Sequence, residues 1–149
     1  MDHNAIAKAG EIINSKTDFI GGGMEGYATV SLIDENGYPA STTMTISKAD
    51  GIKWLTFLSG LSANPAKRVN ICNRACVCLS SSKYHISLQG TVEVLTDIES
   101  KKENWQELMG GYYADKWENP DYCVLRFTTE RYNLYIVDGE LEARGVLLE

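Results

Sequence analysis

The stretch "ATVSLIDENGYPASTTMTI", residues 28–46, decides the fold that the sequence predicts. Apolar Ala28, Val30 and Leu32 alternate with hydroxyl residues, which is typical of a half-buried strand. Asn36-Gly37 follows, and this dipeptide is the strongest short signal for a β-hairpin. The second arm, residues 38–46, is rich in serine and threonine. We therefore expect two antiparallel strands joined by a tight turn.

Further strands of the same kind are predicted after this hairpin. "SKADG" predicts a turn and "IKWLTFL" a third strand, and then "ACVCLSS" and "YHISLQGTVEVLT" predict two strands around a turn at Ser81-Ser82. A last long strand is expected over residues 122–138, and the tail, 139–149, is left unassigned. Consecutive hairpins of this kind favour a mainly β fold, a six-stranded antiparallel barrel with peripheral helices, as one domain over residues 1–149.

Two of the peripheral helices have an apolar stripe. Residues 2–15 place Ile6, Ala9 and Ile13 at helical spacing. Residues 97–109 begin with a capping-box-like Thr96-Asp97-Ile98-Glu99 and precede Gly110 as a stop. In this second helix we expect a buried stripe of Ile98, Trp105 and Leu108. A loop, residues 110–121, then leads to the last strand.

The charge balance limits the possible partners. The net charge is -6 and the pI is near 4.9, and the 14 basic residues are scattered among 20 acids. Nucleic acid binding needs a basic stripe, so it is not expected. No apolar run is long enough for a bilayer span, and the N-terminus lacks the pattern of a signal peptide. We expect a cytoplasmic protein that binds no membrane, with an anion site, if present, built from a few local donors.

Two motifs are judged to be weak. The four cysteines, Cys72, Cys76, Cys78 and Cys123, fit no common zinc pattern and are expected to be reduced. Cys76 and Cys78 share one face of a strand and are interpreted as small core residues. "GGGMEG", residues 21–26, matches G-x-G-x-x-G but precedes a strand, so it is not interpreted as a nucleotide motif.

The segment "FLSGLSANPAKRVN", residues 57–70, is the candidate binding site. Asn64 is expected as the N-cap of a short helix, with Pro65 at its first position, so free N–H groups face the preceding loop. Lys67 in the first turn opposes the helix dipole, and a bound anion would resolve that conflict. Ser59 and Ser62 would add hydroxyl donors, and Gly60 close backbone approach. The alternative is a capped surface helix with solvated cations, and these residues alone leave both open.

Taken in order, these features resemble the pyridoxamine 5'-phosphate oxidase-like FMN-binding split barrels, and especially their general-stress-protein branch. The resemblance covers about residues 5–138. It rests on "ATVSLIDENGYPASTTMT", "WLTFLSGLSANPAKRVNICNRACVCL", "ISLQGTVEVLTD" and "DYCVLRFTTERYNLY". It implies a homodimer with FMN at the subunit interface.

The resemblance also implies roles for single residues. Lys67 corresponds to the basic residue that binds the FMN phosphate, and Ser59 to the hydroxyl that ends the preceding strand. Tyr132 or Tyr135 would approach the flavin from the partner subunit. The full set of implied FMN-binding residues is Thr42, Thr43, Met44, Leu58, Ser59, Ser62, Lys67 and His85.

The chain departs from the family pattern in three places. Many members have an arginine where this chain has Thr42, and a Ser-Arg-Lys run where it has Pro65-Ala66-Lys67. Phosphate binding would therefore rest on Lys67, the helix N-terminus and hydroxyls, with Arg68 compensating. The tail "GELEARGVLLE" lacks the arginine-histidine signature of the true oxidases, so vitamin B6 oxidation is not expected.

The flavin carries the chemistry in this architecture, so no catalytic side chains are predicted and none form a hydrolase-like triad. The leading hypothesis is an FMN-dependent oxidoreductase, with NADH or NADPH as the reductant and an unknown small acceptor. The alternatives are a non-catalytic flavin-binding or stress-related protein, and a haem- or deazaflavin-binding member of the same fold.

Overall fold

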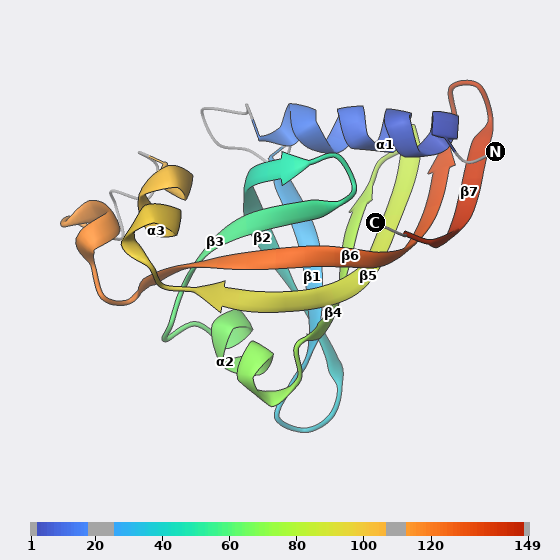
Figure 1. Cartoon of the computed structure of the whole chain (residues 1–149). Helices are drawn as coiled ribbons and strands as arrows, with labels where there is room; N and C mark the ends of the chain where they lie inside the picture. Colours follow the sequence, from blue (N-terminus) through green and yellow to red (C-terminus); the bar gives the residue numbers. More distant parts are fainter. Residues whose placement is uncertain (1–2, 18–25, 107–112, 148–149) are drawn as a thin grey trace.

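The computed structural model describes residues 3–17, 26–106 and 113–147, and Figure 1 shows its course. The helices are α1 (His3–Lys16), α2 (Asn64–Ile71), α3 (Ile98–Asn104) and the short 3-10 helix η2 (Lys116–Glu118). The strands are β1 (Tyr27–Ile33), β2 (Pro39–Asp50), β3 (Trp54–Gly60), β4 (Arg74–Ser80), β5 (Tyr84–Leu95), β6 (Tyr122–Ile136) and β7 (Leu141–Val146).

The strands form one antiparallel sheet in the order β3-β2-β1-β4-β5-β6-β7, which closes through an extra pairing of β3 with β6. Strand β6 makes closure possible because it is 15 residues long. Its first half pairs with β3, its second half pairs with β7, and β5 follows it along the other edge. The predicted six-stranded antiparallel barrel is thus confirmed. Strand β7, in the tail that the sequence left unassigned, is an outer addition.

The predicted hairpin between β1 and β2 is also confirmed. Its turn is closed by a backbone bond from Asp34 N–H to the Tyr38 carbonyl at 2.8 Å. The Asp34 carboxylate accepts from the N–H groups of Asn36 and Tyr38. Gly37 has a φ of 84°, in the left-handed region where a side chain would be strained.

The barrel interior is filled by one apolar cluster drawn from all seven strands. Helix α1 lies across one end of the barrel (Figure 1) and contacts β2, β6 and β7. Ala9 and Ile13 of α1 are fully buried there and Ile6 packs against them, as the helical spacing predicted. Among the described residues, no helix is long and apolar enough to cross a bilayer.

A β-bulge lies where β5 and β6 meet. The register shifts between Gln89, which pairs with Arg131, and Gly90, which pairs with Thr129, so Glu130 is the extra residue. Gly90 is required at this point because a Cβ there would lie 1.9 Å from the Thr128 carbonyl oxygen. Beyond the bulge, Arg131, Asn133 and Tyr135 are exposed while the residues between them are buried.

The predicted boundary between the second and third strands is wrong. "SKADG" is not a turn as a whole, because β2 continues to Asp50 and the turn follows at residues 51–53. The pairing of β2 with β3 is irregular at Ser47. The strand can continue through this point because the buried Ser47 hydroxyl forms hydrogen bonds with Thr56 and Asn104.

Helix α3 starts as predicted but buries a different face. Asp97 caps it by accepting from the Ser100 N–H, yet Ile98 is 53% exposed, while Lys101 and Asn104 are 6% exposed. The polar residues are buried because each finds a hydrogen-bond partner there. The helix ends at Asn104, and Leu108 and Gly110 lie outside the described residues, as do residues 21–25 of the "GGGMEG" stretch.

Candidate functional site

The candidate site is the connection from β3 to α2. Ser59 and Gly60 end β3, and both are buried. Helix α2 begins one residue earlier than its sequence suggests, with Ala63 as the N-cap and no side-chain capping bond. The prediction of Asn64 as N-cap is therefore wrong, because Asn64 is already the first helical residue and is exposed. Pro65 fits in the first turn, where its missing N–H has no intrahelical partner.

An acidic side chain from elsewhere in the sequence occupies this loop. Asp121 Oδ1 accepts from the Ser62 N–H at 2.9 Å, and its Oδ2 accepts from the Ser62 hydroxyl at 3.1 Å. The Tyr113 hydroxyl donates to the same Oδ2 at 2.9 Å. The Asp121 carbonyl also accepts from the Leu61 N–H at 2.7 Å. The donors that the sequence assigned to an external anion at Ser62 are thus satisfied by the chain itself.

Gly60 is required for this arrangement. A Cβ at Gly60 would lie 2.5 Å from the Tyr113 hydroxyl oxygen and 2.6 Å from Asp121 Oδ2. The close backbone approach predicted for Gly60 does occur, but toward these two side chains.

The hydrogen bonds around Asp121 change the pKa values of Asp121 and Tyr113. Desolvation acts to raise the pKa of the Asp121 carboxyl, but the bonds from Ser62 and Tyr113 outweigh it and hold that pKa below its ordinary value. Burial, together with the bond to Asp121 and its charge, raises the pKa of Tyr113 to about 12. The carboxylate is therefore charged, and the phenol neutral, at physiological pH.

A small aromatic cluster supports the loop from behind. Leu58, Tyr122 and Val124 form its buried part, and Trp105, Tyr113 and Trp117 pack against them. The rings of Trp105 and Tyr122 meet edge to face, with centroids 5.3 Å apart. Lys101 Nζ donates to the Asn119 carbonyl at 2.8 Å, and the Tyr122 hydroxyl donates to the Lys101 carbonyl at 2.7 Å. Leu58, an implied FMN contact, is 7% exposed within this cluster.

Two cations on α2 have donors that no described residue uses. Lys67 is exposed, and its ammonium has no ion-pair or hydrogen-bond partner in the described part of the chain. Arg68 is half-buried, and its Nε is a buried donor without an acceptor. A buried unpaired donor is costly, and an anion beside α2 would relieve it. These two residues fit a phosphate group, whereas Ser62 is already bonded to Asp121.

The three implied contacts on β2 do not share one face. Thr42 and Met44 alternate with Thr43, and Met44 is 6% exposed in the barrel core. Thr43 is exposed and lines a shallow pocket with Lys16, Thr29 and Tyr84. Only Thr43 of this trio therefore offers its side chain freely to a ligand.

The structure places His85 and Tyr135 together as register partners on β5 and β6. His85 is exposed and Tyr135 is 39% exposed. Tyr132, the other aromatic candidate, is 8% exposed and lies against Gly145 of β7, where a Cβ would meet its hydroxyl at 3.0 Å. Of the two tyrosines, Tyr135 is the accessible one. His85 is not adjacent to Thr43, because β1 and β4 separate their strands in the sheet.

Mostly polar residues line the outer face of the sheet in two rows, which we call the outer rows, and apart from Thr43 the sequence interpretation assigned none of them to a binding site. Cross-strand partners share a face of a sheet. The first outer row is Ser41, Ser31, Cys76, Gln89, Arg131 and Val146. The second is Thr43, Thr29, Cys78, Ser87, Asn133 and Arg144. The alternation of apolar and polar residues along β6 could have indicated which side chains face outward, but the bulge at Glu130 interrupts that alternation.

The outer rows also correct the interpretation of two cysteines as core residues. Cys76 and Cys78 share a face, as predicted, but that face is the outer one and both are half-buried. Burial, and then the neighbouring Cys76, raise the pKa of the Cys78 thiol above its ordinary value, which keeps it protonated.

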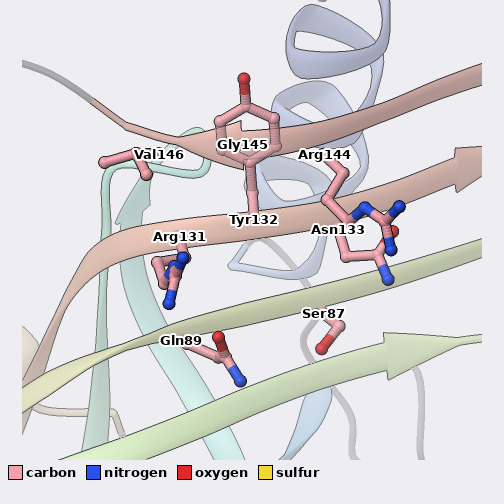
Figure 2. A pocket seen from close by; sticks show the side chains of 8 residues that line it. All are labelled: Ser87, Gln89, Arg131, Tyr132, Asn133, Arg144, Gly145 and Val146. Atoms are coloured by element: carbon pink, nitrogen blue, oxygen red, sulfur yellow. The ribbon is translucent and has the colours of Figure 1, made fainter.

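Figure 2 shows a shallow pocket at the β5–β6–β7 end of the outer rows, lined among others by Arg131 and Arg144. Neither arginine was singled out from the sequence. Arg144 lies in the tail that was left unassigned.

Comparisons with known proteins bear on the whole of this fold. A family model described as pyridoxamine 5'-phosphate oxidase like matches residues 25–136, more than half of the chain. No curated protein matches the chain significantly.

Several solved structures are similar. One is a protein from Clostridium acetobutylicum related to general stress protein 26 of B. subtilis, with a TM-score of 0.80 and 26% identity over 99% of this chain and 97% of that one. General stress protein 26 from Bacillus anthracis gives 0.69 and 16% identity over 92% and 97%. A heme binding protein from Mycobacterium smegmatis gives 0.68 and 14% identity over 95% and 57%.

Proposed function

Because this chain belongs to the pyridoxamine 5'-phosphate oxidase-like family, we propose that it binds FMN beside α2 and works as an oxidoreductase. The observation that carries the proposal is the pair of unused donors on that helix, the Lys67 ammonium and the buried Arg68 Nε. Helix α2 follows the end of β3 in the chain, where Ser59 is 9% exposed. Two cations without acid partners in a chain of net charge -6 favour a bound dianion.

The chain's own residues would do three things. Lys67 and Arg68 would hold the phosphate, while Ser62 keeps its bonds to the Asp121 carboxylate. Thr43 offers a hydroxyl on the outer side of β2, with Thr42 and Met44 shaping the strand behind it. The aromatic cluster around Tyr122 keeps the loop between β3 and α2 in place. FMN, when bound, supplies hydride-accepting chemistry that no side chain provides.

We further propose that two chains form a homodimer with the flavin between them. Of the implied residues, only Thr43, Ser62, Lys67 and His85 are exposed, and they come from β2, the loop before α2, α2 and β5, of which β2 and β5 are not neighbours in the sheet. A second copy presenting His85 and Tyr135 would complete the site, because these two exposed side chains are register partners. Sedimentation of the purified protein would give a dimer mass, and a monomer at micromolar concentration would contradict this part of the proposal.

The reductant we propose is NADH or NADPH, and the acceptor is a small molecule. The decisive experiment is the absorbance spectrum of the freshly purified protein, followed by titration with FMN. Yellow protein, or saturable FMN binding, supports a flavin site, whereas protein that stays colourless and binds no FMN contradicts it. Anaerobic bleaching by NADH or NADPH would support the oxidoreductase, while bound flavin that neither nucleotide reduces would indicate a flavin-binding protein without turnover.

One similar structure gives a second candidate. The Mycobacterium smegmatis protein of the same fold is named for heme binding. If this chain takes the same ligand, titration with haem will produce a saturable Soret band while FMN binds weakly or not at all. The sequence expectation of a cytoplasmic location is unchanged in either case.

A further inference from the structure

We propose that the pocket between Arg131 and Arg144 binds a small molecule through its carboxylate or phosphate oxygens. The pocket has a volume of about 270 Å³ and opens on the outer face of β5, β6 and β7. In Figure 2, Arg131 and Gln89 lie toward one end of it and Arg144 and Asn133 toward the other, with Ser87 below and Tyr132 pointing away. This proposal concerns a different set of residues from the α2 site.

The register of the strands places the two arginines on the same face of the sheet. Asn133 pairs with Arg144 and Arg131 pairs with Val146, so the two arginines are diagonal neighbours across β6 and β7. Such neighbours are about 7 to 8 Å apart at the backbone, within reach of long side chains. Like charges at these positions repel each other unless an anion lies between them.

No acid among the described residues forms an ion pair with either arginine. The ion pair found among the described residues joins Lys8 and Glu11, at 3.6 Å, on α1. Glu142 shares the outer side of β7 with Arg144, and Glu130 adjoins Arg131. Neither of these two carboxylates lies within ion-pair distance of either guanidinium group. Neither guanidinium group makes a hydrogen bond to another described residue. Two unpaired guanidinium groups in an acidic chain therefore face one pocket.

The other lining groups suit an oxyanion. Guanidinium groups present forked N–H donors that match carboxylate and phosphate oxygens. Gln89 and Asn133 add amide donors, and Ser87 adds a hydroxyl that lies 3.7 Å from the Cys76 thiol. All of these groups come from strands of the barrel or the adjoining β7, so the site is held by regular structure.

The rest of the ligand has a place beside this pocket. A larger trough of about 520 Å³ shares Gln89 and Arg131 with it. The trough is lined by apolar Leu32, Ile33, Pro39 and Ala75, together with Cys72, Cys76 and the oppositely charged Arg74 and Glu130. The arrangement suits an anionic head group held by the arginines and an uncharged body lying along β1 and β4.

The test uses the purified protein without added FMN, so that its result does not depend on the flavin proposal. Pyrophosphate and succinate are titrated separately at constant ionic strength by isothermal calorimetry. Arg131→Gln and Arg144→Gln are compared with Lys48→Gln, which removes an exposed charge from β2 outside the pocket. Far-UV circular dichroism checks that each variant is folded.

We expect saturable binding of at least one probe, weakened on the order of tenfold by each arginine variant and unchanged by Lys48→Gln. A preference for pyrophosphate would identify the phosphate class, and a preference for succinate the carboxylate class. No saturable binding of either probe would overturn the proposal. Equal weakening by all three variants would also overturn it, because net charge alone would then explain the effect.

Discussion

The carboxylate of Asp121 holds Ser62 by two hydrogen bonds, at 2.9 Å from the backbone N–H and 3.1 Å from the hydroxyl. These residues are 59 positions apart in the sequence, so the contact ties the start of β6 to the loop before α2. The anionic group that this loop binds through Ser62 is therefore a side chain of the protein itself, the carboxylate of Asp121.

Replacing Asp121 by Asn should destabilise the fold. An amide can accept from one Ser62 donor but places its own N–H₂ against another, so we expect a loss of about 1 to 2 kcal/mol in the free energy of unfolding. Urea denaturation measures it. Asp138→Asn is the matched control, because Asp138 is exposed and its side chain has no bond to the described residues. Equal effects of the two changes would contradict the role of Asp121.

The same pair gives a prediction for pH. The folded-state pKa of Asp121 is lowered relative to the ordinary value of 3.8, so its contribution to stability is fully present above about that pH. The contribution is lost as the pH falls through the folded-state pKa. The stability difference between the wild type and Asp121→Asn should therefore be constant near neutrality and shrink in acid. Urea midpoints measured from pH 7 down to pH 3 test this, and a difference that grows in acid would contradict it.

Gly60→Ala should be destabilising by about 1 to 3 kcal/mol, because the new methyl group overlaps the bonded Tyr113 and Asp121 side-chain oxygens. Removing the hydroxyl in Tyr113→Phe takes away one of the two overlapping atoms. The double variant should then cost less than the sum of the single changes. Thermal or urea unfolding of the four proteins gives the coupling, and strict additivity would show that Tyr113 does not limit the space at Gly60.

Lys67→Ala should weaken FMN roughly tenfold and riboflavin much less, because it removes a phosphate contact and leaves the ring contacts unchanged. Fluorescence titration with both ligands measures the difference. Lys83→Ala removes another exposed cation, in the turn between β4 and β5, and should change neither affinity. An equal loss of affinity for FMN and for riboflavin would contradict the assignment of Lys67 to the phosphate.

Asn104→Ala should detach α3 from the barrel. Its Oδ1 lies 2.7 Å from both the Ser47 and the Thr56 hydroxyl oxygens, which are 7% and 4% exposed. Loss of this acceptor leaves a buried donor unsatisfied, at a cost of about 1 to 3 kcal/mol. Glu103→Ala, an exposed neighbour on the same helix, is the control and should be nearly neutral. Unfolding by urea, followed through tryptophan fluorescence, compares the two.

The fold could be predicted well because its signals are local. Asn36-Gly37 marks a turn by its own backbone preference, and Ala28, Val30 and Leu32 define a strand face by simple alternation. The expected apolar stripe at Ile98 failed for the opposite reason. Helix α3 buries Lys101 and Asn104 because their partners, the Asn119 carbonyl and the Ser47 and Thr56 hydroxyls, come from other parts of the chain.

The candidate site was predictable only in part. The segment around Lys67 has a recognisable composition, and its two cations have no partner among the residues that the structure describes. Nothing local in the sequence places Asp121 against Ser62, since that contact depends on the register of β3 with β6. The pocket at Arg131 and Arg144 likewise depends on strand β7 and on a one-residue irregularity in β6.

That irregularity, the extra residue Glu130, determines which side chains of β6 enter the barrel. Before it, Leu125, Phe127 and Thr129 point inward, and after it the inward set is Tyr132, Leu134 and Ile136. Odd-numbered positions are inside on one side of the bulge and even-numbered positions on the other. A regular strand of the same sequence, without the bulge, would turn a guanidinium, an amide and a phenol toward the hydrocarbon interior, whereas deleting Glu130 itself would leave regular alternation with Tyr132, Leu134 and Ile136 still inside. The deletion should therefore keep cooperative unfolding in calorimetry, because the same side chains fill the interior and only the local bend of the bulge is lost.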